Sequence, residues 1–128
     1  MNLPDDAYAA ALAGLPDVGP ARLVGLLEGD RPAADVWAAL LAGGPLPDGV
    51  AEGSMLGQWR SAARRIDVAR QWAALAAAGV RVVRRGAAGY PAVLTDDPEA
   101  PAVLFVRGDL AALEGPRVGV IGTRRCSH

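Results

Sequence analysis

A glycine turn near the end of the chain carries the residues best suited to bind an anion. The apolar run 118–121 leads into Gly122, Thr123 and Arg124, and Ser127 follows three positions later. Glycine lets a ligand approach the backbone closely, and Thr and Ser add hydroxyl donors. The guanidinium of Arg124 can hold a phosphate with two parallel hydrogen bonds. We therefore predict a phosphate site at Gly122, Thr123, Arg124 and Ser127.

The setting of this turn is the second reason for the prediction. An entirely apolar run such as 118–121 is typical of a strand buried on both faces, and amides at the start of a following helix point at an anion. In open α/β sheets the ligand crevice lies at the carboxyl ends of the strands. The alternative is an ordinary strand-to-helix turn with a solvated arginine, since the segment is neither GxGxxG nor a Walker loop.

The elements that must position this turn differ before and after residue 79. Apolar periodicity, acidic first turns and terminal glycines predict helices, and short β-branched runs predict strands. The expected helices are 5–13, 20–27, 33–42 and a long helix over 54–78; the expected strands are 80–83, 102–106 and 118–121. The long helix is indicated by an apolar stripe of Met55, Trp59, Ala62, Ile66, Ala69, Ala73 and Ala76.

This order of elements predicts two units. Residues 1–78 form a small all-α domain that resembles SAM or helix–hairpin–helix modules, and residues 79–128 form the truncated start of an α/β Rossmann-like domain. Two or three strands without covering helices cannot make a sound core. We therefore expect the second unit to be incomplete in this chain.

The charge of the chain is concentrated rather than spread. The net charge of −1 argues against a nonspecific nucleic-acid coat. Residues 1–59 carry eight acids and two arginines, whereas residues 60–85 carry seven arginines and one aspartate. The mid-chain arginines could follow a nucleic-acid backbone, but a solvated helix face that balances the acidic helices is the favoured interpretation.

Other residues with potential chemistry are better explained by structure. The turn Leu15–Pro20 resembles a helix–hairpin–helix turn, but Asp17 stands where such turns carry their first glycine, and a carboxylate repels phosphate. We expect Trp37, Trp59 and Trp72 to pack in the core rather than stack on bases. The sequence suggests no catalytic residues, no metal site and no cofactor.

The single cysteine, Cys126, excludes an intramolecular disulfide and favours a reducing, cytoplasmic setting. The acidic N-terminus lacks the charge of a secretory signal, and no apolar run reaches the ~18 residues of a membrane span.

The second half of the chain resembles the DNA-processing protein A (DprA/Smf) family. That family has a Tyr-Pro-x-x-Leu segment, a Pro-x-x-Leu-Phe strand with a Gly turn, and a strand ending in Gly-Ser/Thr-Arg-x-x-Ser/Thr. The matching positions here are Tyr90-Pro91, Leu94, Asp97-Pro98, Pro101, Leu104-Phe105, Gly108, Leu113, Val118 to Arg124, and Ser127. The resemblance covers residues 79–127 closely and the helical part loosely.

The resemblance implies a cytoplasmic protein that binds single-stranded DNA and helps load the RecA recombinase during natural transformation. It implies that Arg124 contacts DNA and that Gly122, Thr123 and Ser127 lie near its phosphates. It also implies a homodimer and a RecA-contact surface in the full-length protein, mostly in regions beyond His128.

Two other functions remain open from the sequence. Nucleotide phosphoribohydrolases of the "lonely guy" type share a strand followed by Gly-Ser/Thr-Arg, but they need a downstream Pro-Gly-Gly-x-Gly-Thr and Glu constellation. The helical domain and the Tyr-Pro to Leu-Phe segment favour DNA binding over this enzyme. The third reading is a helical interaction module in residues 1–78 that binds a protein partner.

Overall fold

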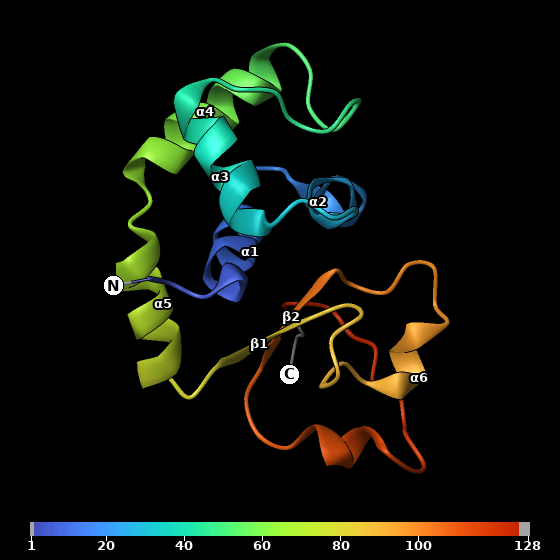
Figure 1. The fold of residues 1–128 in the computed structure, drawn as a ribbon. Helices are drawn as coiled ribbons and strands as arrows, with labels where there is room; N and C mark the ends of the chain where they lie inside the picture. The colour runs from blue at the N-terminus through green and yellow to red at the C-terminus, as the bar shows by residue number, and fades with distance from the viewer. Residues whose placement is uncertain (1, 126–128) are drawn as a thin grey trace.

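The computed structural model describes residues 2–125 and places a group of helices beside a small sheet (Figure 1). The elements in chain order are α1 (Asp5–Ala13), α2 (Gly19–Leu27), α3 (Ala33–Ala42), α4 (Ser54–Arg65), α5 (Val68–Ala77), β1 (Arg81–Arg84), α6 (Ala92–Thr95), β2 (Val103–Val106) and the 3-10 turn η1 (Leu110–Leu113). The all-α character expected for the first part of the chain is confirmed.

The first three helices lie where their end signals predict them. Asp5 and Asp6 occupy the first turn of α1, where acidic groups favour the helix dipole. Pro20 lies in the first turn of α2. Gly43 ends α3 in the left-handed conformation, with φ of 76°. Local signals were sufficient here because each helix has a strong start or stop.

The single long helix expected over 54–78 is wrong, because the chain breaks at Ile66 and Asp67. Ile66 is extended, with φ −88° and ψ 120°. Asp67 caps the next helix, since its side chain accepts a hydrogen bond from the Arg70 amide at 3.0 Å. Helix α4 packs beside α3, whereas α5 packs beside α1. The break lets the two halves cover different neighbours.

The break also changes which residues of the second half are buried. Trp59 and Ala62 are buried, as the predicted stripe requires, but Ala69, Ala73 and Ala76 are exposed. The face of α5 that packs against the rest of the protein instead carries Val68, which is buried, and Gln71, Trp72 and Leu75, which are half-buried. Because the helix restarts at Asp67, the periodicity of α4 does not continue through α5.

The helices enclose one apolar core. Its largest fully buried side chains are Trp59, Leu12, Leu26, Leu40 and Val36. The buried indole satisfies its polar atom, because Trp59 Nε1 donates a hydrogen bond to the Pro16 carbonyl oxygen at 2.8 Å. This bond fixes α4 against the turn between α1 and α2.

The two strands form an antiparallel pair in which Val82 faces Phe105 and Val83 faces Leu104. Val82 and Val103 pack into the helical core. Val83 and Leu104 belong to a second cluster with Tyr90 and Ala100 on the other side of the sheet. The sheet is therefore covered on both faces. The main core crosses residue 79, and the domain boundary expected there stays a prediction.

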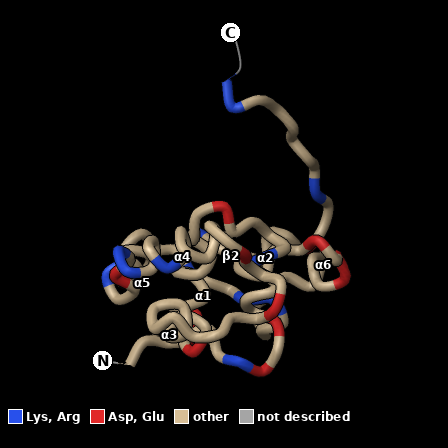
Figure 2. Tube along the Cα trace, turned by 90° about the horizontal axis from the view of Figure 1, so that it is seen from above, with Lys and Arg blue, Asp and Glu red and all other residues tan. Residues whose placement is uncertain are grey.

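The third expected strand, 118–121, is not formed in the part of the chain described. Val118, Val120 and Ile121 are 89%, 93% and 99% exposed, and the segment leaves the body after η1 (Figure 2). No strand of residues 2–125 pairs with it. An all-apolar strand is stable only when neighbours cover it, and here it has none. The Rossmann-like start remains a prediction.

Asp5 connects three elements that are far apart in the sequence. Its carboxylate accepts hydrogen bonds from the Ala33 and Ala34 amides at the start of α3, at 3.0 and 2.8 Å. It also pairs with Arg84 of β1 at 2.6 Å. Partial burial raises the pKa of Asp5, but the two amides and Arg84 outweigh burial and leave the pKa below its ordinary value of 3.8.

Replacing Asp67 tests the cap that restarts the helix. We expect Asp67→Ala to lower the free energy of unfolding by about 1 kcal/mol in urea titrations, because it removes an N-cap acceptor. Asp67→Asn should retain most of the stability, since asparagine also caps well. An unchanged midpoint for Asp67→Ala would contradict the role of the cap.

The depressed pKa of Asp5 predicts a pH-dependent contribution to stability. A carboxylate with a lowered folded-state pKa stabilises the fold above its unfolded pKa, and this contribution is lost as pH falls through the folded pKa. Asp5→Ala should therefore be much less stable than the natural sequence at about pH 7, and the difference should shrink below about pH 4. Asp6→Ala, a neighbour without these bonds, is the control for urea titrations at both pH values. A constant difference would count against the ionised network.

Candidate functional site

The predicted phosphate residues are exposed on the segment that leaves the body. Apart from its two chain neighbours, no part of residues 2–125 lies within 4 Å of the position that a Cβ would take on Gly122. Thr123 Oγ1 accepts a hydrogen bond from the Arg125 amide at 3.1 Å and donates to the Arg125 carbonyl oxygen. No hydrogen bond or ion pair of the Arg124 side chain is seen among residues 2–125. The Arg124 guanidinium therefore faces solvent.

Among residues 2–125, no second element lies against this loop. Gly122, Thr123 and Arg124 are neighbours in the chain, and Ser127 lies outside the described residues, as does the expected helix start. The geometry that would converge amides and hydroxyls on a phosphate is therefore untested, and the four-residue site stays a prediction.

The hairpin turn between α1 and α2 has the backbone of a glycine turn despite its aspartate. Asp17 has φ of 53° and Gly19 has φ of 63°. The left-handed region favours glycine, although aspartate and asparagine tolerate it better than most residues. Asp17 is exposed, and a carboxylate in such a turn repels a phosphate.

The mid-chain arginines separate into two groups. Four of them bond within the fold. Arg84 pairs with Asp5, Arg60 donates to the Gly44 carbonyl oxygen, and Arg81 donates to that of Gly108. Arg85 donates to the carbonyl oxygens of Ala100 and Asp97. The side chains of Arg64, Arg65 and Arg70 are exposed, and no hydrogen bond or ion pair of theirs occurs among residues 2–125. Figure 2 shows basic positions at the edge of the molecule beside α5. The basic patch is thus smaller than the sequence suggests.

The aromatic side chains act mainly in packing. Trp59 and Trp37 are buried at 0% and 4% exposure, and half-buried Trp72 packs against the same core. The prediction of core tryptophans is confirmed. Tyr90 is also buried, and its hydroxyl donates to the Pro101 carbonyl oxygen at 2.8 Å. Tyr90 therefore anchors the loop that precedes β2.

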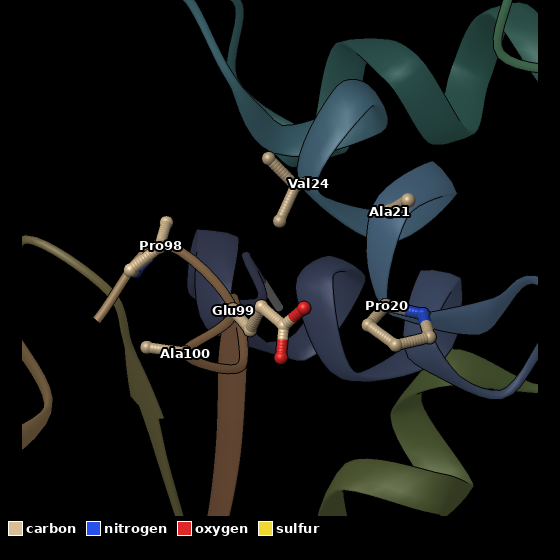
Figure 3. Close-up of a pocket in the computed structure, with 6 residues that line it drawn as sticks. All are labelled: Pro20, Ala21, Val24, Pro98, Glu99 and Ala100. Atoms are coloured by element: carbon tan, nitrogen blue, oxygen red, sulfur yellow. The ribbon is translucent and has the colours of Figure 1, made fainter.

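A cleft of about 540 Å³ lies between α2 and residues 98–100 (Figure 3). Its lining is apolar apart from Glu99: Pro20, Ala21, Val24, Pro98 and Ala100. In Figure 3 the Glu99 carboxylate points into the space toward Pro20. A carboxylate at this place disfavours an anionic ligand, so this cleft does not suit a phosphate.

A second cleft, of about 470 Å³, lies between the hairpin turn and α4. Its lining is Pro16, Gly57, Gln58, Ser61 and Arg65. The last three are spaced by three and four residues, so they share one face of α4. The sequence pattern indicates Arg65 only as one of the mid-chain arginines. It does not indicate the hollow, because the hollow depends on Pro16, which lies far from α4 in the sequence.

No helix of residues 2–125 is long and apolar enough to cross a membrane. The same residues contain no group of three His, Cys, Asp or Glu side chains that could hold a metal ion.

Residues 81–128 match the family described as DNA recombination-mediator protein A. The expected resemblance to the DNA-processing protein A family is confirmed for this segment, which includes β1, β2 and the Gly122 loop. No curated protein matches the chain, and no solved structure matches it.

The matched segment predicts a measurable role for Tyr90. We expect Tyr90→Phe to lower the free energy of unfolding by about 1 kcal/mol, because it leaves the Pro101 carbonyl without its partner. Tyr8→Phe, at a half-buried tyrosine that makes no hydrogen bond among the described residues, is the matched control. Equal stability of the two variants in thermal unfolding would show that the Tyr90 hydroxyl contributes nothing.

Proposed function

We propose that this protein is a recombination mediator that binds single-stranded DNA, with the loop Gly122–Ser127 as a phosphate contact. The observation that carries the proposal is the family match of residues 81–128, which covers the whole loop. The chemistry agrees with it. The exposed Arg124, which has no side-chain partner among residues 2–125, is available to a phosphate, and glycine lets the DNA backbone approach closely.

Residues near Arg124 have separate roles in this proposal. Arg124 neutralises and grips a phosphate, and Gly122 leaves room for it, in line with the open space around that residue. Thr123 and Ser127 add hydroxyl donors to the same group. Thr123 Oγ1 already engages the Arg125 backbone, so we expect that contact to be exchanged when DNA binds.

The proposal of a specific cellular role is based on the family resemblance alone. We propose that the protein acts in the cytoplasm, helps load the RecA recombinase on single-stranded DNA in natural transformation, and works as a homodimer in its full-length form. We further propose that its activity is binding rather than catalysis. Release of adenine from AMP by the protein would instead favour the phosphoribohydrolase alternative.

Replacing Arg124 tests the phosphate contact. We expect Arg124→Ala to weaken binding to an oligo-dT several-fold at low salt and to reduce the salt slope by about 0.7, the value of one single-strand phosphate contact. The measurement is fluorescence anisotropy over a series of salt concentrations. Arg107→Ala removes the same charge from another exposed arginine and serves as the control. Identical curves for both variants would reject Arg124 as a specific contact.

A further inference from the structure

The cleft between the hairpin turn and α4 lies outside the segment that matches the family. Its residues run from Pro16 to Arg65, whereas the match begins at residue 81. A ligand bound in this cleft would therefore contact a surface separate from the loop around Arg124.

The polar side of the cleft consists of hydrogen-bond donors that have no partner among residues 2–125. Gln58, Ser61 and Arg65 are exposed, and none of their side chains forms a hydrogen bond or an ion pair within the described part of the chain. Arg64 precedes Arg65 in the last turn of α4 and is exposed as well. The Arg65 guanidinium, the Ser61 hydroxyl and the Gln58 amide thus line one hollow, and Arg64 adds a second exposed guanidinium next to Arg65 in the chain.

Guanidinium, hydroxyl and amide donors favour a partner that carries several negatively charged hydrogen-bond acceptors. Four of the seven mid-chain arginines bond within the fold. The other three, Arg64, Arg65 and Arg70, are exposed and form no ion pair among residues 2–125. Asp67 lies between Arg65 and Arg70 in the chain, and one of its carboxylate oxygens accepts a hydrogen bond from the Arg70 amide. Pro16 lines the other wall, and the exposed Asp17 that follows it in the chain carries the opposing charge. The excess of exposed arginines over aspartates favours a sugar–phosphate backbone that runs along α4 and past the turn.

We propose that this cleft is a second contact surface for the backbone of single-stranded DNA. Arg64 and Arg65 neutralise phosphates, and Gln58 and Ser61 donate hydrogen bonds to phosphate or sugar oxygens. The proposal rests on the proposed function for the nature of the ligand, but it uses none of the residues of the Gly122 loop. Asp17 limits affinity, because its carboxylate borders the path of the DNA.

Paired variants of the 128-residue chain test the surface by anisotropy with an oligo-dT. We expect Arg64→Ala/Arg65→Ala to weaken binding roughly tenfold at about 50 mM salt and to lower the salt slope by about 1.4, which corresponds to two phosphate contacts. Arg22→Ala/Arg107→Ala removes the same charge elsewhere and should have a much smaller effect. Arg64→Lys/Arg65→Lys should restore the slope, because lysine keeps the charge.

A second variant gives an effect of opposite sign. Asp17→Asn keeps a residue that tolerates the left-handed backbone and removes the repelling charge, so it should tighten binding about twofold with little change of slope. The arginines also complement the C-terminal dipole of α4. Urea titrations of every variant therefore accompany the binding curves and show whether it remains folded at the assay temperature.

The outcomes separate this inference from the proposed function. If Arg124→Ala weakens binding and Arg64→Ala/Arg65→Ala behaves as the charge control, the cleft is rejected and the loop stands. The reverse result supports the cleft and rejects the loop. If the natural sequence does not bind the oligonucleotide, or if an acidic polypeptide such as polyglutamate displaces it equally well, the assignment of the cleft to DNA is overturned.

Discussion

The carboxylate of Asp5 is the contact on which the arrangement of the chain depends. It holds the first amides of α3 and the guanidinium of Arg84, so one side chain in the first helix joins the third helix to the first strand. The amides at a helix start and a cation favour the ionised form together. The sheet is thereby held beside α1, which contacts both of its strands.

The break at Asp67 has the next largest effect on the shape. A continuous helix could not follow both α3 and α1, and the cap at Asp67 stabilises the restart. The break leaves the end of α4 exposed, with Arg64 and Arg65 in its last turn. The same feature that completes the helical core therefore creates the basic side of the cleft beside the hairpin turn.

The two candidate DNA contacts differ in how much structure supports them. The cleft at α4 is built by elements held through Trp59 and the Pro16 carbonyl. In the described part of the Gly122 loop, the hydrogen bonds are local and join Thr123 to Arg125. Its assignment comes from sequence similarity, whereas the assignment of the cleft comes from charge and geometry.

The sequence by itself determined the elements with strong local signals: the first three helices, the strand positions near 81 and 103, and the buried tryptophans. It also carried the resemblance of residues 81–128 to the DNA-processing protein A family. Only the tertiary structure decided the break at Ile66, the buried face of α5, and which arginines are engaged by the fold. These depend on contacts across tens of residues, such as Asp5 with Arg84, that no local pattern contains. The apolar run 118–121 shows the same limit, because an apolar strand forms only where neighbours cover it.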